Sequence, residues 1–586
     1  MFEVLKINLT EEEKQIIKIS RSDIKKYLGG KCLSIKMLLD YLKEGIDPLG
    51  SENILTIMGG PLSGTIAPSM KCAVATKSPL TNTITVGFMG GHIIKNIREA
   101  GFLGIMIEGK CKNPSYIYIE DEEVKIIEAP ELWGLGTFET EEVLYRRHGR
   151  GSGIVSIGPA GENMVPFSVV NTDFYRQAAR GGPGAVLGSK KIKAVVVKGT
   201  GEQNSLISDS FLEIVKSITS DLALKPGLSR FRKWGTTAAV MKSNEQSSLP
   251  TKNFNEEFFE KAENISGERG EALFWFKRRG CVSCPVGCGH IGRVCEGPFK
   301  GVIIEGPEYE TAALIGSNLC IDDFSSLAYL NNRCDFWGLD TISSGAVLSF
   351  YSECVENSVL DDTLGLKGNI WGNVEAYQHL LELIAKKEGI GEILSLGVKK
   401  AAEVIGPKAQ EYAMHVKGLE IPGWGPHRAP GMAVAYATAD RGADHQQAFP
   451  LSYEIGSDLD KQSFEYIDNV AKIIIEHQNY NSMVNSIIGC DFTFGAIDFG
   501  KIIEMLKCVT GIEFLEEDLL KVGGLSVNLA KQFNEREGGE FVIGDIPERF
   551  FKKALSTGPN AGTFIDKLVY DKIKDRYLEL RGWINN

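Results

Sequence analysis

The sequence predicts an α+β fold of several domains: a β-rich N-terminal base domain followed by two mostly α-helical domains. The chain has 586 residues, well beyond the ~250–300 at which one hydrophobic core stops growing, so we expect two to four domains. Apolar runs in the N-terminal third are short, rich in β-branched side chains and separated by glycine, proline or asparagine, as is typical of strands. Farther along the chain, apolar residues recur every three or four positions, which indicates amphipathic helices.

Eight strands and two helices are expected in the base domain, residues 1–203. The helices are expected at 21–28, continuing to 41, and at 91–100. The strands are expected where short apolar runs are bounded by turn residues, at 2–9, 53–58, 72–76, 83–87, 104–108, 116–120, 153–157 and 192–198.

A linker is expected at 200–208, where GTGEQNSLISDS marks a change of composition. We expect the helical part beyond it to divide into two domains, 204–412 and 413–586. Helices are expected wherever amphipathic spacing is sustained, at 209–222, 323–337, 341–356, 373–387, 390–405, 461–477, 500–510, 516–536 and 547–555.

Charge and hydropathy limit the class of protein. The net charge of −12 argues against a nucleic-acid partner, because such proteins normally carry a basic surface. The N-terminus lacks a signal peptide, and no apolar run approaches the ~18 residues that would span a membrane. We therefore expect a soluble, cytoplasmic protein without membrane insertion, whose 12 cysteines are thiols or metal ligands rather than disulfides.

Glycine-rich turns are dense in the base domain. They are MGGPLSG at 58–64, FMGGHI at 88–93, IGPAGEN at 157–163 and ARGGPGAVLGSKK at 179–191. A single such turn is most simply a hairpin turn, but four of them suggest a surface where main-chain N–H groups meet an anionic ligand. None has the Gly-Lys-Ser/Thr ending of a P-loop, and none is a clean G-x-G-x-x-G after a strand, so an ordinary nucleotide site is disfavoured.

Three cysteines are concentrated in the sequence CVSCPVGC, at Cys281, Cys284 and Cys288. Thiolates are soft ligands that suit zinc, copper(I) or iron–sulfur centres, and these spacings let one turning loop direct several sulfurs at a common centre. A fourth ligand must come from elsewhere in the chain. The spacing alone leaves a structural zinc site as an alternative.

Several motifs in a fixed order resemble the aldehyde:ferredoxin oxidoreductase family of tungsten enzymes. In the second half they are CVSCPVGC, EGPEYET (305–311), DFWGLD (335–340), RGADH (441–445) and a lone cysteine in NSIIGC (485–490). In the base domain they are TKSPLT (76–81), FMGGH (88–92), IGPAGE (157–162) and ARGGPGAVLGSKKIKA (179–194). The resemblance implies tungsten, less often molybdenum, held by two pyranopterin dithiolenes, with magnesium bridging the pterin phosphates and a [4Fe–4S] cluster nearby.

The resemblance also implies which residues bind these groups. Cys490 would complete the cluster ligands, and Asp335 and Asp340 would accept hydrogen bonds from pterin N–H groups. Asn485 and Gly489 belong to a second copy of that motif, which usually reads Asp-x-x-Gly-Leu-Cys, so the second pterin's contacts are altered here. The remaining expected pterin or phosphate contacts are Lys71, Gly90, Gly91, Arg180, Gly181 and Leu339.

Glu310 and His445 are the expected acid–base pair. Oxidation of an aldehyde to an acid needs groups that accept and donate protons near neutral pH, which suits histidine and a carboxylate tuned by burial. Glu308 and Glu310 would point to different sides of a helix. Their spacing to DFWGLD favours Glu310, and Glu308 is the alternative.

The expected activity is interconversion of aldehydes and carboxylic acids, with electrons passing through the cluster to ferredoxin or a ferredoxin-like subunit. Alternatives that keep the cofactors are oxidation of a sugar aldehyde and reduction of an aromatic acyl-CoA within a larger complex. An alternative of another class is a non-catalytic iron–sulfur scaffold subunit, which the altered NSIIGC motif favours. Some relatives dimerise through a metal held by Glu-x-x-His; residues 329–332 lack that pair, so a homodimer or hetero-oligomer would need another contact.

Overall fold

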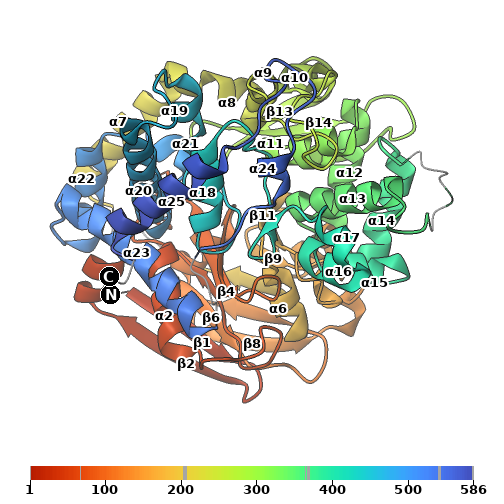
Figure 1. Ribbon diagram of the computed structural model, residues 1–586. Coiled ribbons are helices and arrows are strands. Elements are labelled where there is room, and N and C mark those ends of the chain that lie inside the picture. Colours follow the sequence, from red (N-terminus) through yellow and green to blue (C-terminus); the bar gives the residue numbers. More distant parts are fainter. Residues whose placement is uncertain are drawn as a thin grey trace.

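Two β-sheets form the base of the molecule and helices cover the rest of it (Figure 1). The computed structural model describes residues 2–65, 68–201, 207–362, 365, 370–538 and 543–583. This arrangement confirms the predicted fold class of a β-rich N-terminal part followed by a mostly helical part. Residues 202–206 of the expected linker lie outside the described residues.

The first sheet has six strands in the order β2-β1-β6-β3-β4-β5. Only the β1–β6 pair among these is parallel. Alternation along β1 sends Leu5 and Ile7 to one face of the sheet and Val4 to the other, and both faces are covered. The strands are β1 (Phe2–Asn8), β2 (Glu13–Ile19), β3 (Leu55–Met58), β4 (Lys71–Lys77), β5 (Ile84–Gly90) and β6 (Gly104–Glu108).

The second sheet has six strands in the order β11-β10-β9-β12-β7-β8. It shares one apolar core with the first sheet, to which α3 (Ile93–Glu99) and α6 (Pro183–Ser189) also contribute. Its strands are β7 (Ser115–Glu120), β8 (Glu123–Glu128), β9 (Gly153–Ser156), β10 (Val170–Thr172), β11 (Arg176–Ala178) and β12 (Ile192–Lys198). The base is therefore a sandwich of two mixed sheets.

Helices of both sequence halves cover the outer faces of the base. Helix α2 (Gly30–Tyr41) lies between the first sheet and the helices α20 and α23, and α4 (Thr137–His148) covers the second sheet. The other helices of the base are α1 (Arg21–Tyr27) and α5 (Pro159–Glu162).

The largest apolar core lies among the helices. It draws buried side chains from both sides of residue 412, so the expected boundary there stays a prediction. The helices up to residue 410 are α7 (Asp209–Leu224), α8 (Ser229–Trp234), α9 (Val240–Glu245), α10 (Gly267–Leu273), α11 (Tyr309–Thr311), α12 (Phe324–Trp337), α13 (Thr341–Glu356), α14 (Val374–Lys386), α15 (Ile390–Leu394), α16 (Val398–Ile405) and α17 (Pro407–Gln410). The later helices are α18 (Pro430–Thr438), α19 (Leu451–Gly456), α20 (Phe464–Ile487), α21 (Asp491–Phe494), α22 (Phe499–Thr510), α23 (Glu516–Arg536), α24 (Arg549–Lys552) and α25 (Lys567–Arg581).

The structure corrects the sequence-based element boundaries at several places. Strands β2, β8, β10 and β11 and helices α4, α18 and α25 were not predicted. The helix expected at 390–405 is two helices, because Gly397 takes a left-handed φ of +83° between them. The helix expected to continue from 21 to 41 is likewise interrupted, at Leu28 and Gly29. None of the described helices is long and apolar enough to cross a membrane.

Candidate functional site

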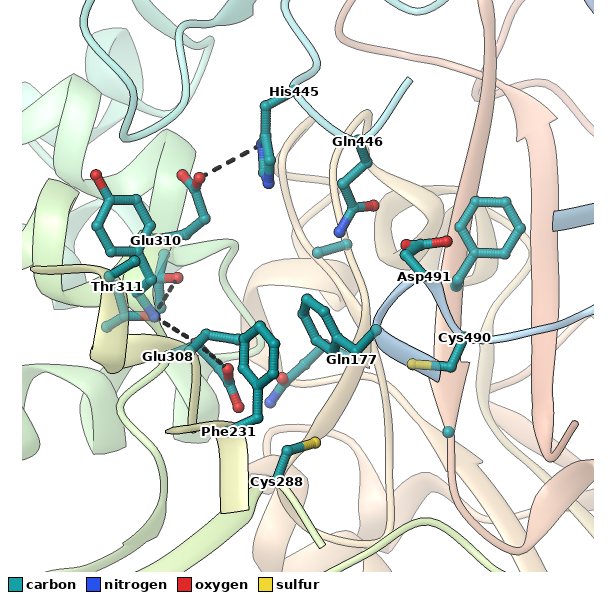
Figure 2. Close-up of a pocket in the computed structure, with 18 of the residues that line it drawn as sticks. Gln177, Phe231, Cys288, Glu308, Glu310, Thr311, His445, Gln446, Cys490 and Asp491 are labelled. Carbon is teal, nitrogen blue, oxygen red and sulfur yellow. Dashed lines mark hydrogen bonds and ion pairs between the residues drawn. The ribbon is translucent and has the colours of Figure 1, made fainter. Parts of the chain in front are cut away.

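A cavity of about 630 Å³ lies where the base meets the helical part. Its walls come from β4, β5 and β11 of the base and from α11, α12 and the segment that follows α20. Figure 2 shows Glu310 and His445 at one end, Cys288 at the other, and Cys490 with Asp491 along one side. Motifs separated by hundreds of residues in the sequence therefore open onto one space.

The three clustered cysteines lie on the loop between β13 (Trp275–Arg279) and β14 (Gly289–Arg293), which form a three-stranded sheet with β15 (Ile303–Glu305). The loop turns sharply: the Cys284 N–H donates to the Cys281 carbonyl at 3.0 Å. Cys281 and Cys288 line the cavity. Cys490, at the start of α21, reaches it from the opposite wall.

The four thiols are close enough to influence one another's ionisation. Burial raises the pKa of Cys284, and the neighbouring Cys490 and Cys281 raise it further. Burial also raises the pKa of Cys288 and of Cys490. Four thiolates in one low-dielectric place would be unfavourable unless a cation or metal centre compensated their charge.

Lys71 supplies part of that compensation. Burial works to lower the pKa of Lys71, but the negative charges of Cys490 and Asp491 outweigh it and the pKa is raised. Lys71 begins β4 and pairs across the sheet with Gly90 on β5, so both lie at the cavity. Its ammonium group thus stays charged beside the thiols.

Gly90 and Arg176 fix the position of Cys281. A Cβ atom added to Gly90 would lie 2.5 Å from the Cys281 Sγ. Arg176 donates from Nη1 to that sulfur at 3.0 Å and from Nη2 to Glu305 Oε1 at 2.6 Å. Sequence reasoning missed the roles of both residues: Arg176 belongs to no motif, and Glu305 begins EGPEYET, which does not by itself link it to the cysteines.

The cysteines suit a multinuclear centre better than a single ion. Among the residues that the structure describes, no group of three or more His, Cys, Asp or Glu side chains is arranged to hold one metal ion. A structural zinc site would need four ligands at ~2.0–2.3 Å from one point. Four thiols spread around a common space, with Lys71 and Arg176 directed at them, fit the larger iron–sulfur cluster.

The DFWGLD motif forms the turn between α12 and α13. Asp335 accepts from Gln177 Nε2 and Asn331 Nδ2, each at 2.8 Å, and burial raises its pKa well above the usual range. Asp340 caps α13 by accepting from the backbone of Ile342. Both carboxyl groups line the cavity, as does Leu339.

A glycine contact between the two halves of the chain sets this turn. Gly338, with φ +74°, ends α12, and a Cβ on it would lie 2.8 Å from the Gly158 nitrogen. A Cβ on Gly158 would lie 2.4 Å from the Trp337 carbonyl oxygen. The IGPAGEN turn therefore permits close packing against DFWGLD. Gly90 is the one glycine of the four described turns that lines the cavity, so an anion-binding role for the other three turns stays a prediction.

The remaining expected pterin contacts lie behind the cavity wall. Arg180 donates to the carbonyls of Ala443, at 2.9 Å, and Glu420, and its Nε lies 3.6 Å from Asp340 Oδ2. Gly181 packs against the Thr85 side chain and Gly91 against Asp173. These three residues do not line the described cavity, so their direct contact with a cofactor stays a prediction.

The second copy of the motif ends α20 with an unusual residue. Ile488 takes the left-handed φ of +65° at the position where DFWGLD has Gly338, and Gly489 packs on the ring of Phe494. Asn485 is buried, and its carbonyl oxygen faces Gly30. Asn485 and Gly489 do not line the described cavity, whereas Cys490 does.

Glu310 and His445 meet at the end of the cavity farther from Cys288 (Figure 2). His445 Nδ1 lies 3.4 Å from Glu310 Oε1, and the other carboxylate oxygen accepts from the Gly423 N–H at 2.6 Å. Glu308 instead accepts from the Thr236 hydroxyl, and its charge acts on Cys288. The two glutamates thus serve different ends of the cavity, as their spacing predicted.

An aromatic wall lies beside this pair. The Trp424 ring is 4.2 Å from the Tyr309 ring and 4.8 Å from the Phe449 ring, centroid to centroid, and all three residues line the cavity. The Tyr309 hydroxyl donates to the Gly423 carbonyl at 2.5 Å. Tyr309 lies within the EGPEYET motif, but Trp424 and Phe449 gave no signal in the sequence.

Several polar atoms of the wall have no hydrogen-bond partner among the described residues. They include Glu310 Oε1, His445 Nδ1, Asp491 Oδ1 and Trp424 Nε1. Buried polar groups are normally hydrogen-bonded, so each unpaired one calls for a ligand or water. Carboxylates, donors and a cation around one space fit a large polar cofactor.

Comparisons with known proteins cover almost the whole chain. A family model described as "Aldehyde ferredoxin oxidoreductase, N-terminal domain" matches residues 4–199, and "Aldehyde ferredoxin oxidoreductase, domains 2 & 3" matches residues 213–586. The tungsten-containing aldehyde ferredoxin oxidoreductase of Thermococcus kodakarensis is 36% identical over 589 residues, covering 99% of this chain and 95% of that protein. The WOR-like subunit of the aliphatic sulfonate oxidoreductase of Pyrococcus furiosus is 31% identical over 612 residues, covering 98% and 93%.

The fold is also found in a solved structure. The active-site complex BamBC of benzoyl coenzyme A reductase with 1,5-dienoyl-CoA superimposes with a TM-score of 0.84 and 22% identity, covering 99% of this chain and 94% of that chain. At this identity the likeness shows a shared fold.

Proposed function

The chain belongs to the aldehyde ferredoxin oxidoreductase family, and from that premise we propose that it is a tungsten-dependent oxidoreductase that interconverts aldehydes and carboxylic acids. The reaction is RCHO + H2O → RCOO⁻ + 3 H⁺ + 2 e⁻. Two electrons and three protons must leave the site, the electrons toward a one-electron carrier such as ferredoxin. The required parts are therefore a redox cofactor, a proton-handling pair and an electron exit.

One observation carries the proposal: the Glu310–His445 pair lines the same cavity as Cys281, Cys288 and Cys490, and Cys284 lies on the same loop as the first two of these cysteines. Proton handling and electron exit are then separated within one space. A scaffold subunit would not need an acid–base pair beside an aromatic wall. The presence of both Glu310 and His445 therefore argues against the non-catalytic alternative.

The proposed cofactor sites follow from the donor sets. Cys281, Cys284, Cys288 and Cys490 would hold a [4Fe–4S] cluster, with Lys71 and Arg176 balancing its charge. Asp335 and Asp340 would bind pterin N–H groups at the opposite wall. When bound, the tungsten pterin supplies Lewis acidity and two-electron capacity. Magnesium bridging the pterin phosphates belongs to the same proposal.

The chain's own residues would bind the aldehyde and manage its protons. The Gly423 N–H orients Glu310, leaving Oε1 toward His445. His445 can then take a proton from the attacking water while Glu310 stabilises the imidazolium that forms. Both side chains must approach more closely than the present 3.4 Å to share that proton, which is a common difference between free and ligand-bound sites.

The aromatic wall favours an apolar, and in particular an aromatic, aldehyde. Tyr309 and Phe449 both contact the Trp424 ring, all three residues line the cavity, and Tyr309 precedes Glu310 in the chain. Offset or edge-to-face contacts between rings contribute ~0.5–1.5 kcal/mol beyond area burial, so an aryl aldehyde would gain up to about tenfold in binding over a short aliphatic one. The names of the sulfonate and benzoyl-CoA relatives leave substrate shifts open, and the aromatic wall would suit a benzoyl group as well as an aryl aldehyde, so it does not distinguish these two substrates.

Metal analysis combined with an aldehyde panel tests the proposal. Anaerobically purified protein should contain about one tungsten or molybdenum and about four irons per chain, and it should reduce a viologen dye with benzaldehyde as the electron donor. Zinc in place of iron, or both metals without oxidation of any aldehyde, would reject the proposed activity.

A further inference from the structure

A second cavity of about 460 Å³ opens at the surface directly beside the cysteine loop. It is lined by side chains of α8 and β13 and by His290 on β14. In Figure 1 these elements lie together at the top of the molecule. We propose that this surface, the basic face of the hairpin, binds a small acidic electron-transfer protein that receives electrons from the cysteine site.

The first support is charge. Arg232, Lys233, Lys277 and Arg278 line the cavity, against one acidic residue, Glu271. The side chains of Lys277 and Arg278 are exposed and form no ion pair within the described parts of the chain. The chain as a whole has a net charge of −12, so a local excess of cations is a departure from its average surface. Such a patch attracts an acidic partner and raises its association rate.

The second support is composition. Phe276 lies on the same face and leaves 62% of its surface exposed, next to the half-buried Trp275. Isolated exposed aromatic residues are common, but aromatic residues and arginine gathered in one concave place are typical of the buried centre of protein interfaces. The face therefore offers an apolar anchor as well as charge.

The third support is the path to the cysteines. His290 Nδ1 lies 2.9 Å from the Cys288 carbonyl oxygen, and the His290 ring is 4.5 Å from the Trp275 ring. A Cβ on Gly235, which follows α8, would lie 3.0 Å from that same carbonyl. His290 therefore contacts the Cys288 backbone and also lines the second cavity. A carrier seated there would lie nearer to the cysteine loop than to the Glu310–His445 pair.

The inference rests on the proposed function for its source of electrons. Each aldehyde oxidised releases two electrons, and each carrier accepts one, so two carriers must bind in succession. Weak, fast and salt-sensitive binding is suited to that exchange, and a charged rim around a small anchor supplies it. Because the partner leaves after each electron, a small basic face is sufficient.

The test compares a protein acceptor with a small one in the holoenzyme. The variant Lys277→Glu/Arg278→Glu should lower kcat/KM for an acidic single-cluster ferredoxin by about tenfold or more, because charge steering changes association rates by 10–10³. Its rate with benzyl viologen and its iron content should be unchanged. The matched control is Lys399→Glu/Lys400→Glu on α16, which lies away from β13 in Figure 1 and should leave both acceptors unaffected.

Two further measurements keep the inference open to refutation. If the double reversal loses iron, the charge-neutral variant Lys277→Gln/Arg278→Gln replaces it, with a smaller loss expected. Calorimetric binding of the ferredoxin to wild-type holoenzyme needs no turnover, so it tests the face even if aldehyde oxidation fails, and its affinity should fall steeply with added NaCl. Equal ferredoxin kinetics in wild type and an iron-replete variant, or salt-independent binding, would overturn the inference while leaving the dye-linked activity untouched.

Discussion

His445 Nδ1 faces Glu310 Oε1 across 3.4 Å, and neither atom has a hydrogen-bond partner among the described residues. A purely structural pair would be closed by a hydrogen bond, because a buried unpaired polar group costs ~1–3 kcal/mol. The Gly423 N–H holds only the far oxygen of the carboxylate. The pair is thus held in position while Glu310 Oε1 and His445 Nδ1 remain free to accept or donate protons, as a proton-handling site requires.

We predict that Glu310→Gln and His445→Asn each lower aldehyde oxidation by roughly 10²–10⁴-fold. Both variants keep approximate size and hydrogen-bonding capacity while removing acid–base function, so tungsten and iron should be retained. Rates with a viologen dye and metal content, measured on the same preparations, check this. Glu308→Gln is the comparison for the alternative carboxylate, and it should lose less activity than Glu310→Gln. Loss of metal together with activity would instead assign the pair to cofactor binding.

Part of this site could be predicted from local sequence motifs. Cys281, Cys284 and Cys288 lie on one loop, so their spacing alone indicated a metal or cluster site. The hairpin that carries them was not predicted, because β13 reads WFKRR and most of its side chains are exposed, which leaves no alternation of apolar and polar residues. A strand held by its neighbours rather than by its own pattern gives no periodic signal.

Contacts between distant segments could not be predicted in this way. Arg176 reaches a sulfur 105 positions later in the chain, and nothing in its surrounding sequence marks that partner. Arg180 was expected to meet phosphate or pterin groups, which stays a prediction, and its guanidinium donates to carbonyls that only the folded chain brings near. Trp424 and Phe449 lie beside Tyr309 for the same reason. The fold class was predictable from periodicity, whereas these pairings depend on the tertiary arrangement.

Cys490→Ala should remove most of the iron and lower the apparent Tm. Cys490 begins α21, and the hairpin cysteines lie more than 200 positions earlier, so a shared cluster would tie two remote segments together and couple metal binding to folding. Iron analysis and thermal unfolding check both effects. Cys508→Ala, which changes a half-buried thiol outside the cavity, is the matched control. Full iron and an unchanged Tm in Cys490→Ala would place the fourth ligand elsewhere.

Gly90→Ala should disturb the cysteine site although it adds only one methyl group. That methyl would lie 2.5 Å from the Cys281 Sγ and 3.2 Å from Arg176 Nη1, so sulfur and guanidinium must move apart. We expect lower iron content and a lower dye-linked rate, with the base domain still folded. Gly151→Ala is the control, since a Cβ there meets no atom within 4 Å and its φ is not left-handed. Iron content equal in the two variants would show that the loop adjusts freely.

Trp424→Leu should change substrate preference more than maximal rate. Removing the indole takes away the ring that contacts both Tyr309 and Phe449, so kcat/KM for benzaldehyde should fall by about tenfold, the upper range of an aromatic contact. kcat/KM for acetaldehyde should change much less. Trp371→Leu, a tryptophan that does not line the cavity, should affect neither aldehyde. A parallel loss for both substrates would assign Trp424 to holding Glu310 through the Gly423 segment.

The left-handed backbone at Ile488 gives an unusual prediction about stability. A β-branched residue at φ +65° costs roughly 1–2 kcal/mol relative to its ordinary conformation, and this cost is kept because the side chain is fully buried against Gly30. Ile488→Ala loses the packing and keeps the backbone cost, whereas Ile488→Gly loses the packing and removes that cost.

Ile488→Gly should therefore be more stable than Ile488→Ala, by about 1 kcal/mol, although both should be less stable than wild type because a buried large-to-small change costs ~2–5 kcal/mol. The matched pair is Ile474→Ala and Ile474→Gly, at a buried position inside α20. There the order should reverse, since glycine costs ~1 kcal/mol relative to alanine within a helix. The apparent Tm values of the four variants, measured at one scan rate, test the predicted order at each position. If alanine is the more stable residue at both positions, the conformation of Ile488 is not strained.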